Sequence, residues 1–300
     1  MSTVTYIAKR VTNQLTNQFA NQHKHQSKSE MNTLSPSTMT SSVMTTSFMT
    51  TGRTLRAYLI EVKYELLRMI RTPAYAFPAL LMPVLLYLLF SIVVVGPNAV
   101  NQPKLPIFMF AAFSVFALTS PGMYGLGQAF AVERQSGVLM LKRTQPMPVG
   151  GYLIAKILTA LVSVTISMSA LIMLANSFGH VALSATQALQ IMAASLLGVA
   201  TFCAIGLFIG SLVSGTAAGG VVNAIYFPMM YLSGTFFPLP DSLAPWAMVW
   251  PTFYLDQIFF AILFGKSAIS VSMCVAILTG LLVFFAGAAS RRLARAADNK

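Results

Sequence analysis

The sequence predicts an all-α integral membrane protein with six transmembrane helices, and two observations carry that prediction. Hydrophobic residues make up 56% of the 300 residues and charged residues only 9%, far from the composition of a soluble domain. Several uncharged apolar runs also reach about 18 residues or more, long enough for a helix to cross a hydrocarbon core of about 30 Å. The net charge of +12 comes from Lys and Arg at the ends of these runs, where they indicate topology rather than nucleic-acid binding.

Residues 1–52 are rich in Ser, Thr, Asn and Gln and contain no apolar segment of the kind that signal peptides carry. Such low-complexity composition buries little apolar surface, so this segment is predicted to be a disordered cytoplasmic extension. A loose four-residue repeat, "TNQLTNQFANQ", places Val11, Leu15 and Phe19 on one helical face. An amphipathic surface helix therefore stays open as an alternative.

Residues 53–72 are predicted to form an amphipathic interfacial helix. Hydrophobic side chains recur at alternating intervals of four and three, and charged side chains occupy the other positions. The helix is basic and directly precedes the first apolar run, which favours a position along the inner membrane surface. Its apolar residues are Leu55, Leu59, Val62, Leu66 and Met69.

Six spans are assigned within a transmembrane domain over residues 73–290. Pro121 and Gly122 in the second span predict a kink or a break, because proline lacks a backbone donor. No Asp, Glu, Lys or Arg occurs from Ile157 to Pro240, so the turns there are assigned to "ANSFGHVALSATQ" and "GSLVSGTAAGG". The expected spans are residues 74–95, 106–132, 153–175, 188–210, 218–237 and 268–289, followed by a basic cytoplasmic tail over 291–300.

The apolar segment 241–266 is interrupted by Pro245, Pro251, Asp256 and Lys266. If it crossed the bilayer, the basic flanks near the two ends of the chain would lie on opposite sides. With six spans both flanks are cytoplasmic, in agreement with the positive-inside bias. The segment is therefore predicted to be an external re-entrant or interfacial helical segment before the last span. Its aromatic residues at headgroup level would be Trp246, Trp250, Phe253 and Tyr254.

No catalytic, metal-binding or cofactor-binding site is predicted, and the chain is expected not to be an enzyme. The string "GKS" at 265–267 ends like a phosphate-binding loop, but the glycine required five residues before Gly265 is Phe260. Cys203 and Cys274 each lie in an apolar run, which favours buried core residues over a disulfide or a metal site.

Ion coupling is disfavoured because all seven acidic residues fall outside the confident spans. Asp256 is the exception if segment 241–266 dips deeply into the membrane. Gly206 and Gly210 form a small-xxx-small pair on the fourth span, which fits helix contact either within one subunit or between two.

The segment "ERQSGVLMLKRTQPMP", residues 133–148, is the one long cytoplasmic loop between the predicted spans. A loop that only marks topology needs only its basic residues. A short helix with an apolar contact and charged edges, stopped by proline, suits docking into a groove of a partner protein. The residues singled out for this role are Glu133, Gly137, Val138, Leu139, Leu141 and Pro146.

Three segments together resemble the membrane subunit of a type-2 ATP-binding-cassette exporter, over about residues 54–290. "AVERQSGVLMLKRTQPMPVGGYLIAKIL" is similar to the family's coupling segment, with Lys156 opening the third span. "LRAYLIEVKYELLRMIRTP" is similar to the family's connecting helix, here with Leu59, Val62, Leu66 and Arg68. "YLSGTFFPLPDSLAPWAMVWPTFYLDQ" is similar to its external segment, here with Gly234, Pro238, Pro245, Trp246, Pro251 and Tyr254.

The resemblance implies an exporter in the bacterial cytoplasmic membrane with both termini cytoplasmic. Two membrane subunits, identical or homologous, would pair above two cytoplasmic ATPase subunits, which would bind the ATP and Mg²⁺. Segment 133–148 would couple nucleotide-driven closure to the spans, although Gln135 replaces an acidic residue that the family often carries there.

The expected cargo is hydrophobic or amphipathic, such as a drug-like molecule, a lipid or a lipid-linked glycan, because no acidic side chain lies in the confident spans. A secondary transporter or channel that acts without an ATPase is the alternative. A membrane protein that assembles with partners but transports nothing is a third.

Overall fold

The computed structural model describes residues 51–71, 81–96, 102–138, 149–178, 181–237, 239–240 and 242–298. The predicted extension before residue 51 and most of the predicted coupling segment, residues 139–148, lie outside this part. All regular secondary structure in the described residues is helical. In chain order the helices are α2 (Thr51–Arg71), α4 (Met82–Phe90), η3 (Ser91–Val95), α6 (Leu105–Ser120), η4 (Pro121–Gln128), α7 (Ala129–Gln135), α9 (Val149–Ser177), α10 (Ala185–Leu212), α11 (Gly215–Leu232), α12 (Ala244–Ala247), α13 (Pro251–Phe264) and α14 (Val271–Asp298).

Four helices in the described part are long and apolar enough to cross a membrane. They are Leu105–Gln135, which joins α6, η4 and α7, together with Leu153–Ser177, Ala185–Leu212 and Val271–Leu293. The segments Met82–Val94 and Pro251–Phe264 are shorter apolar helices. The all-helical membrane class is thus confirmed, whereas six crossings remain a prediction.

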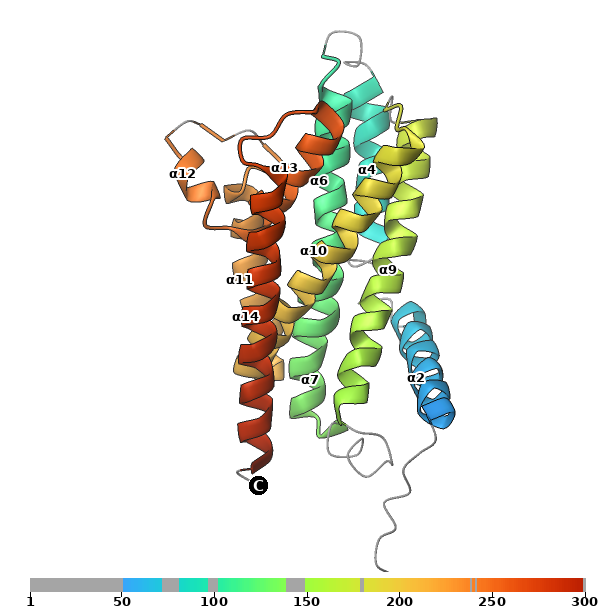
Figure 1. Cartoon of the computed structure of the whole chain (residues 1–300), viewed down its shortest axis with the longest axis vertical. Coiled ribbons are helices and arrows are strands. Elements are labelled where there is room, and N and C mark those ends of the chain that lie inside the picture. Colours follow the sequence, from blue (N-terminus) through green and yellow to red (C-terminus); the bar gives the residue numbers. More distant parts are fainter. Residues whose placement is uncertain are drawn as a thin grey trace, which may run out of the picture. The chain divides into compact units, whose positions relative to one another are not determined.

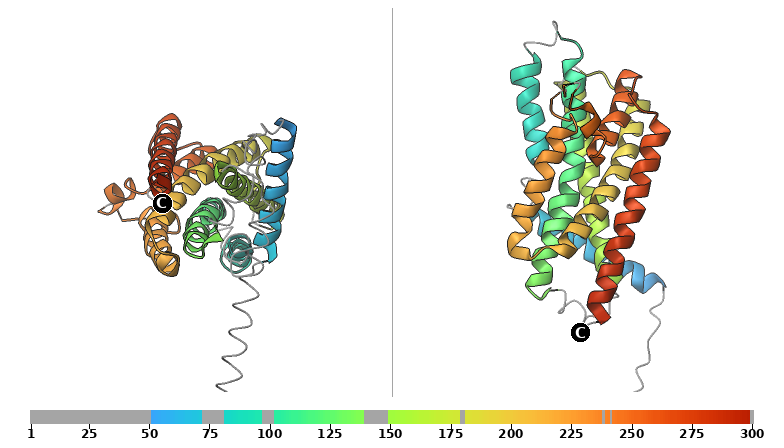
Figure 2. Two further views of the ribbon diagram at one scale, coloured as in Figure 1. Left: turned by 90° about the horizontal axis from the view of Figure 1, so that it is seen from below. Right: turned by 90° about the vertical axis from the view of Figure 1, so that its left-hand side faces the viewer.

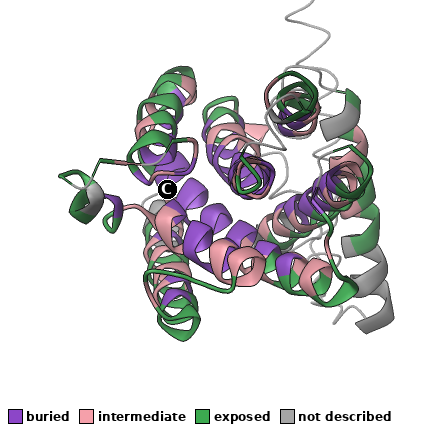
Figure 3. Cartoon of the chain, turned by 90° about the horizontal axis from the view of Figure 1, so that it is seen from above, coloured by how far each residue is buried: buried purple, intermediate pink, exposed green. Residues whose placement is uncertain are grey.

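The helices of the unit Thr51–Lys300 run largely side by side (Figures 1 and 2). Helix α2 crosses beside the end of the bundle where α9 begins, and α13 lies toward the opposite end. The buried side chains concentrate where α6, η4 and α10 meet (Figure 3). Helix α14 carries exposed apolar side chains such as Val283 and Phe284, as a helix that faces lipid would.

At Pro121, where the sequence predicts a kink or a break, the helix does not break but contains a π-helical stretch, η4, within one continuous 31-residue helix. Proline lacks the N–H that would bond to the preceding turn, and a wider turn accommodates that loss. The hydroxyl of Ser120 donates to the carbonyl oxygen of Phe116 at 2.9 Å, and Thr119 donates to Val115 at 2.8 Å. These bonds satisfy backbone acceptors just before the wide turn.

Glycines allow η4 and α10 to touch backbone to backbone. A Cβ atom on Gly206 would lie 2.2 Å from the carbonyl oxygen of Gly122, and one on Gly210 would lie 2.3 Å from that of Gly127. No side chain larger than hydrogen fits at such distances. The small-xxx-small pair therefore packs within the subunit, which is one of the two readings that the sequence left open.

Several helix ends differ from the predicted limits for local reasons. Helix α11 ends at Leu232, and Gly234 then adopts a left-handed conformation with φ of +84°, so residues 233–237 are not helical. Helix α10 begins at a capping box in which Ser184 and Gln187 satisfy each other's backbone N–H. Residues 291–298 of the predicted tail continue helix α14.

Candidate functional site

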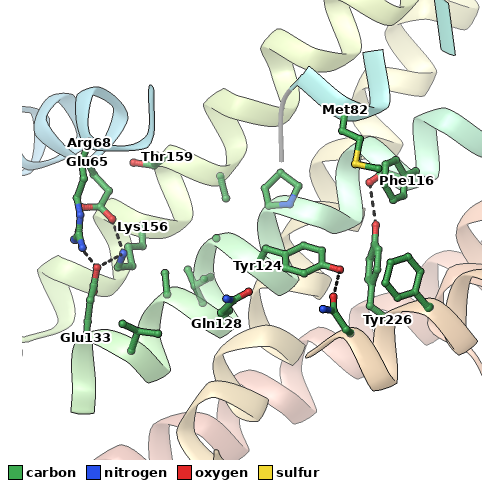
Figure 4. A pocket seen from close by; sticks show the side chains of 18 residues that line it. Glu65, Arg68, Met82, Phe116, Tyr124, Gln128, Glu133, Lys156, Thr159 and Tyr226 are labelled. Atoms are coloured by element: carbon green, nitrogen blue, oxygen red, sulfur yellow. Dashed lines mark hydrogen bonds and ion pairs between the residues drawn. The ribbon is translucent and has the colours of Figure 1, made fainter. Parts of the chain in front are cut away.

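Two acidic and two basic side chains from three helices converge at the C-terminal end of α7 (Figure 4). Oε1 of Glu133 accepts hydrogen bonds from Nη1 of Arg68 at 2.5 Å and from Nζ of Lys156 at 3.2 Å. Nζ of Lys156 also pairs with Oε1 of Glu65, and Arg68 lies 4.0 Å from Glu65. The cluster therefore joins α2, α7 and α9.

The cluster is largely removed from solvent. The Glu133 and Lys156 side chains are only 3% and 4% exposed, and Glu65 is 14% exposed, whereas Arg68 remains half exposed at 53%. Buried charges are tolerated when they are paired and hydrogen-bonded, and these four sum to zero. Oε2 of Glu133, however, is buried without a hydrogen-bond partner among the described residues. Arg68 and Lys156 therefore both contact Glu133 through the same carboxylate oxygen.

The pattern of α2 explains how it supplies two of the four charges. Glu65 and Arg68 are three residues apart, so they share one face of the helix. That face turns toward α9, against which α2 lies (Figure 2). Leu59, on the opposite side of α2, is 61% exposed, and Tyr64, which neighbours Arg68 on the helix surface, is 65% exposed. Such exposed apolar side chains fit a helix at a membrane surface.

The two residues after Glu133 bind a different part of the bundle. The guanidinium of Arg134 donates to the carbonyl oxygens of Ser211 and Val213, the latter at 2.8 Å. Oε1 of Gln135 accepts from the backbone N–H of Thr216 at 3.0 Å. The turn between α10 and α11 is therefore held by the C-terminal end of α7.

A cavity of about 620 Å³ extends from the ion-pair cluster into the bundle. Its volume lies within the range of sites for drug-sized ligands. The lining is mainly apolar and aromatic, and its polar groups include the Tyr124 hydroxyl, which donates to Oδ1 of Asn223 at 2.6 Å. Its aromatic residues are Phe116, Tyr124, Tyr226 and Phe227.

Tyr226 is the most deeply held of these aromatic side chains. It is fully buried, its hydroxyl lies 2.9 Å from Oγ1 of Thr119, and its ring packs edge to face against Tyr124. These contacts come from η4, α6 and α11, so the rings on facing walls of the cavity hold one another in place.

A second polar group lies between α11 and α13. Oγ1 of Thr235 donates to Oδ2 of the buried Asp256 at 2.5 Å and lies 2.7 Å from the Ser233 hydroxyl. Oδ1 of Asp256 is buried without a partner among the described residues. Among all the residues that the structure describes, no group of three His, Cys, Asp or Glu side chains is placed so that it could bind a metal ion.

The structure brings some of the predicted coupling residues together and leaves others undescribed. Glu133 is at the centre of the cluster, and Gly137 follows in a left-handed conformation with φ of +76°. Val138 is half buried. Leu139, Leu141 and Pro146 lie outside the described residues.

The remaining predicted residues fall into two groups. On α2, Val62 and Leu66 are half buried, and Arg68 joins the ion-pair cluster. In the predicted external segment, Trp246 is 66% exposed, and the Tyr254 hydroxyl donates to the Met248 carbonyl at 2.7 Å. Pro245 is exposed, Pro251 begins α13, Gly234 follows α11, and Pro238 lies outside the described residues.

Sequence reasoning missed the partners of Glu133, as well as the roles of Arg134 and Gln135. Lys156 was noted only as the residue that opens the third span, and Arg134 only as one of the basic residues on the inner side. A lone lysine inside an apolar helix is itself a signal, because such a charge requires a partner. The identity of that partner, Glu65 at a separation of 91 residues, has no local signature.

Two comparisons with known proteins bear on this arrangement. The family described as ABC-2 type transporter matches residues 56–264. The chain is also 24% identical to YvfS of Bacillus subtilis (strain 168), whose name gives it as a transport permease. That similarity extends over 196 residues, 64% of this chain and 80% of the relative. Residues 56–264, which the family matches, include most of α2, the ion-pair cluster and the residues that line the cavity.

Proposed function

Because the chain belongs to the ABC-2 type transporter family, we propose that it is the permease subunit of an exporter that a separate ATPase drives. It is a multi-pass membrane protein, and permeases of this family work with ABC ATPase subunits and have no ATPase activity of their own. The finer proposal is that two copies of this chain, or this chain and a homologue, pair in the bacterial cytoplasmic membrane. Both termini would be cytoplasmic, and the bundle would cross the membrane six times.

The observation that carries the proposal is the ion-pair cluster at Glu133. Glu133 lies where the long helix Leu105–Gln135 ends and segment 133–148 begins, and it pairs with Arg68 on α2 and with Lys156 on α9. Movement of this segment by a docked ATPase would be transmitted to α2 and α9 through these ion pairs. ATP and Mg²⁺ would bind on the ATPase subunits.

The cargo proposed is a hydrophobic or amphipathic molecule, such as a drug-like compound, a lipid or a lipid-linked glycan. The cavity supports this class, because its walls are mainly apolar and aromatic and its charged groups at the inner end pair with one another. A highly charged solute would find no unpaired counter-charge in this set of residues.

The direct test begins with purification of the full chain from membranes and identification of a P-loop ATPase that co-purifies. The pair is then reconstituted in vesicles, and ATP-dependent export of lipophilic dyes is measured. Leu139→Ala in the coupling segment should reduce export at least tenfold while the complex still assembles. Export at the original rate by this variant would show that the segment does not couple the two subunits.

Asp256 favours a second candidate function, a secondary transporter that acts without an ATPase. Its carboxyl group is buried within the bundle, and one of its oxygens has no partner among the described residues. Intramembrane carboxyl groups are common at ion-coupling sites. Flux driven by a proton gradient in vesicles that contain this chain alone, and lost in Asp256→Asn, would establish this function and exclude the first.

A further inference from the structure

We infer that Arg134 and Gln135 form a second transmission arm, which carries movement of the coupling segment to helix α11 and so to the wall of the cavity opposite α9. The inference rests on the proposed function and adds positioning residues to it. The first arm is the ion-pair cluster through which Glu133 holds α2 and α9. The second arm is the set of bonds from Arg134 and Gln135 to the turn between α10 and α11.

Each bond of the second arm replaces a cap that the local sequence lacks. Ser214 is the N-cap residue of α11, but its side chain makes no capping bond, so the N–H of Thr216 would lack an acceptor. Gln135 supplies that acceptor from α7. Arg134 likewise supplies donors to carbonyl oxygens at the C-terminal end of α10, where a cation is favoured by the helix dipole.

Close packing makes this connection stiff. A Cβ atom on Gly215, the first residue of α11, would lie 2.8 Å from Cα of Val132 and 2.9 Å from Oε1 of Gln135. The start of α11 is therefore seated directly on α7. A displacement of α7 moves this turn with it, because neither the backbone contact nor the capping bonds leave room for slippage.

The two arms end on the two sides of the cavity. The first arm ends on α9, which contributes Lys156, Thr159 and Ala160 to the lining, and the second ends on α11, which contributes Asn223 and Phe227. The consecutive residues Glu133, Arg134 and Gln135 thus connect one helix end to both walls. A change in the width of the cavity requires that α9 and α11 move by different amounts. We therefore expect that mutation of one arm stops the movement of its own wall and leaves the movement of the other wall unchanged.

Spin-label distance measurements on the full chain with its co-purifying ATPase test this separation. Cys203 and Cys274 are replaced by alanine, and cysteines are introduced at exposed positions: Ile154 at the inner end of α9, Ala217 at the inner end of α11, and Leu189 at the outer end of α10 as the common reference. The distances 154–189 and 217–189 are compared between the nucleotide-free and the ATP–vanadate-trapped complex.

In the unmodified background both distances should shift on trapping. Arg134→Gln combined with Gln135→Ala should abolish the 217–189 shift and keep the 154–189 shift, whereas Glu133→Gln should give the reverse. Gln135→Glu keeps the acceptor and should keep both shifts, as should Arg292→Gln on the exposed surface of α14. If the double variant fails to fold, Gln135→Ala alone serves, with the 217–189 shift at least halved.

Two results would overturn the second arm: both shifts surviving in the Arg134 and Gln135 variants, or both being lost together in either arm's variant. A complex with no shift in the unmodified background would instead refute the proposed function, and the inference would fall with it. The ratio of ATP hydrolysed to dye exported gives an independent readout. It should rise at least fivefold in the second-arm variants while the basal rate of ATP hydrolysis stays within twofold of the original rate.

Discussion

Glu133 and Lys156 form a buried ion pair, with 3.2 Å between Oε1 and Nζ, across the point where the predicted coupling segment leaves the helix bundle. The pair also marks one end of the cavity, because both residues line it. One contact therefore belongs both to the proposed path from the ATPase and to the space proposed for the cargo.

Lys156→Met should destabilise the protein strongly, because it leaves two carboxylates with Arg68 as the only cation of the cluster. Removal of one partner of a buried pair costs about 3–5 kcal/mol. The double variant Lys156→Met with Glu133→Gln retains only the Glu65–Arg68 pair, which is 4.0 Å apart and balanced in charge. It should therefore lose much less stability than the single variant. Thermal unfolding in detergent measures both, and an additive loss would contradict a coupled cluster.

Gly210→Ala should impair folding, because the added Cβ would lie 2.3 Å from the carbonyl oxygen of Gly127 and force α10 away from η4. Overpacking of this kind costs about 1–3 kcal/mol. Gly280→Ala on α14 is the matched control, since its Cβ would meet no atom within 4 Å. The control should be neutral or slightly stabilising in the same melting assay. Equal melting temperatures for the two variants would argue against the close contact.

Phe227→Ala should weaken cargo handling without a large effect on stability, because this side chain lines the cavity but is 49% exposed. Loss of the apolar contact should cost about 1–2 kcal/mol, roughly five- to thirtyfold in the apparent affinity for a lipophilic dye. Phe284→Ala on α14 removes an equally large exposed ring that is not among the residues lining the cavity. In an assay of dye-stimulated ATP hydrolysis by the reconstituted complex, Phe227→Ala should need a higher dye concentration for half-maximal stimulation, and Phe284→Ala should not. Equal effects of the two variants would show that the cargo does not bind in this cavity.

Asp256→Asn should leave ATP-driven export within about twofold of the original rate. The amide oxygen can still accept the hydrogen bond from Thr235, and the amide nitrogen replaces the carboxyl oxygen that has no partner among the described residues. Melting temperature should stay nearly constant, because the amide nitrogen takes a position that has no partner among the described residues in either variant. Loss of ATP-driven export with intact assembly would give Asp256 a role that the ATPase-coupled scheme does not assign.

The sequence was sufficient for the helical class because that class depends on local properties. Uncharged runs of apolar residues predict helices wherever they occur, and α9, α10 and α14 lie in such runs. The wide turn at η4 could be anticipated as an interruption from Pro121, but not as a π-helix, because proline is compatible with several ways of interrupting a helix. The close contact between η4 and α10 could not be anticipated either, because it involves Gly206 and Gly210, about eighty positions later in the chain.

Only the part of the site that lies in one continuous segment of the sequence, around Glu133, could be predicted. Glu133 stood out because it borders a segment with charges in an otherwise apolar chain. Its partners did not, since pairing between α2, α7 and α9 depends on how helices pack and not on spacing along the chain. Arg134 looked like a topology marker for the same reason: a basic residue at a span end has that explanation in every membrane protein, and the carbonyl groups that it binds belong to another helix.

The π-helical stretch η4 affects how the two helical segments that it joins, α6 and α7, are oriented relative to each other. An unbroken α-helix repeats its faces every 3.6 residues, so the direction of Phe116 would fix the direction of Glu133. One additional residue in a wide turn offsets the angular phase by about 100°. The aromatic half and the charged half of this single helix can therefore point to different neighbours. Loss of the wide turn would therefore rotate the charged half of the helix by about 100° relative to the aromatic half.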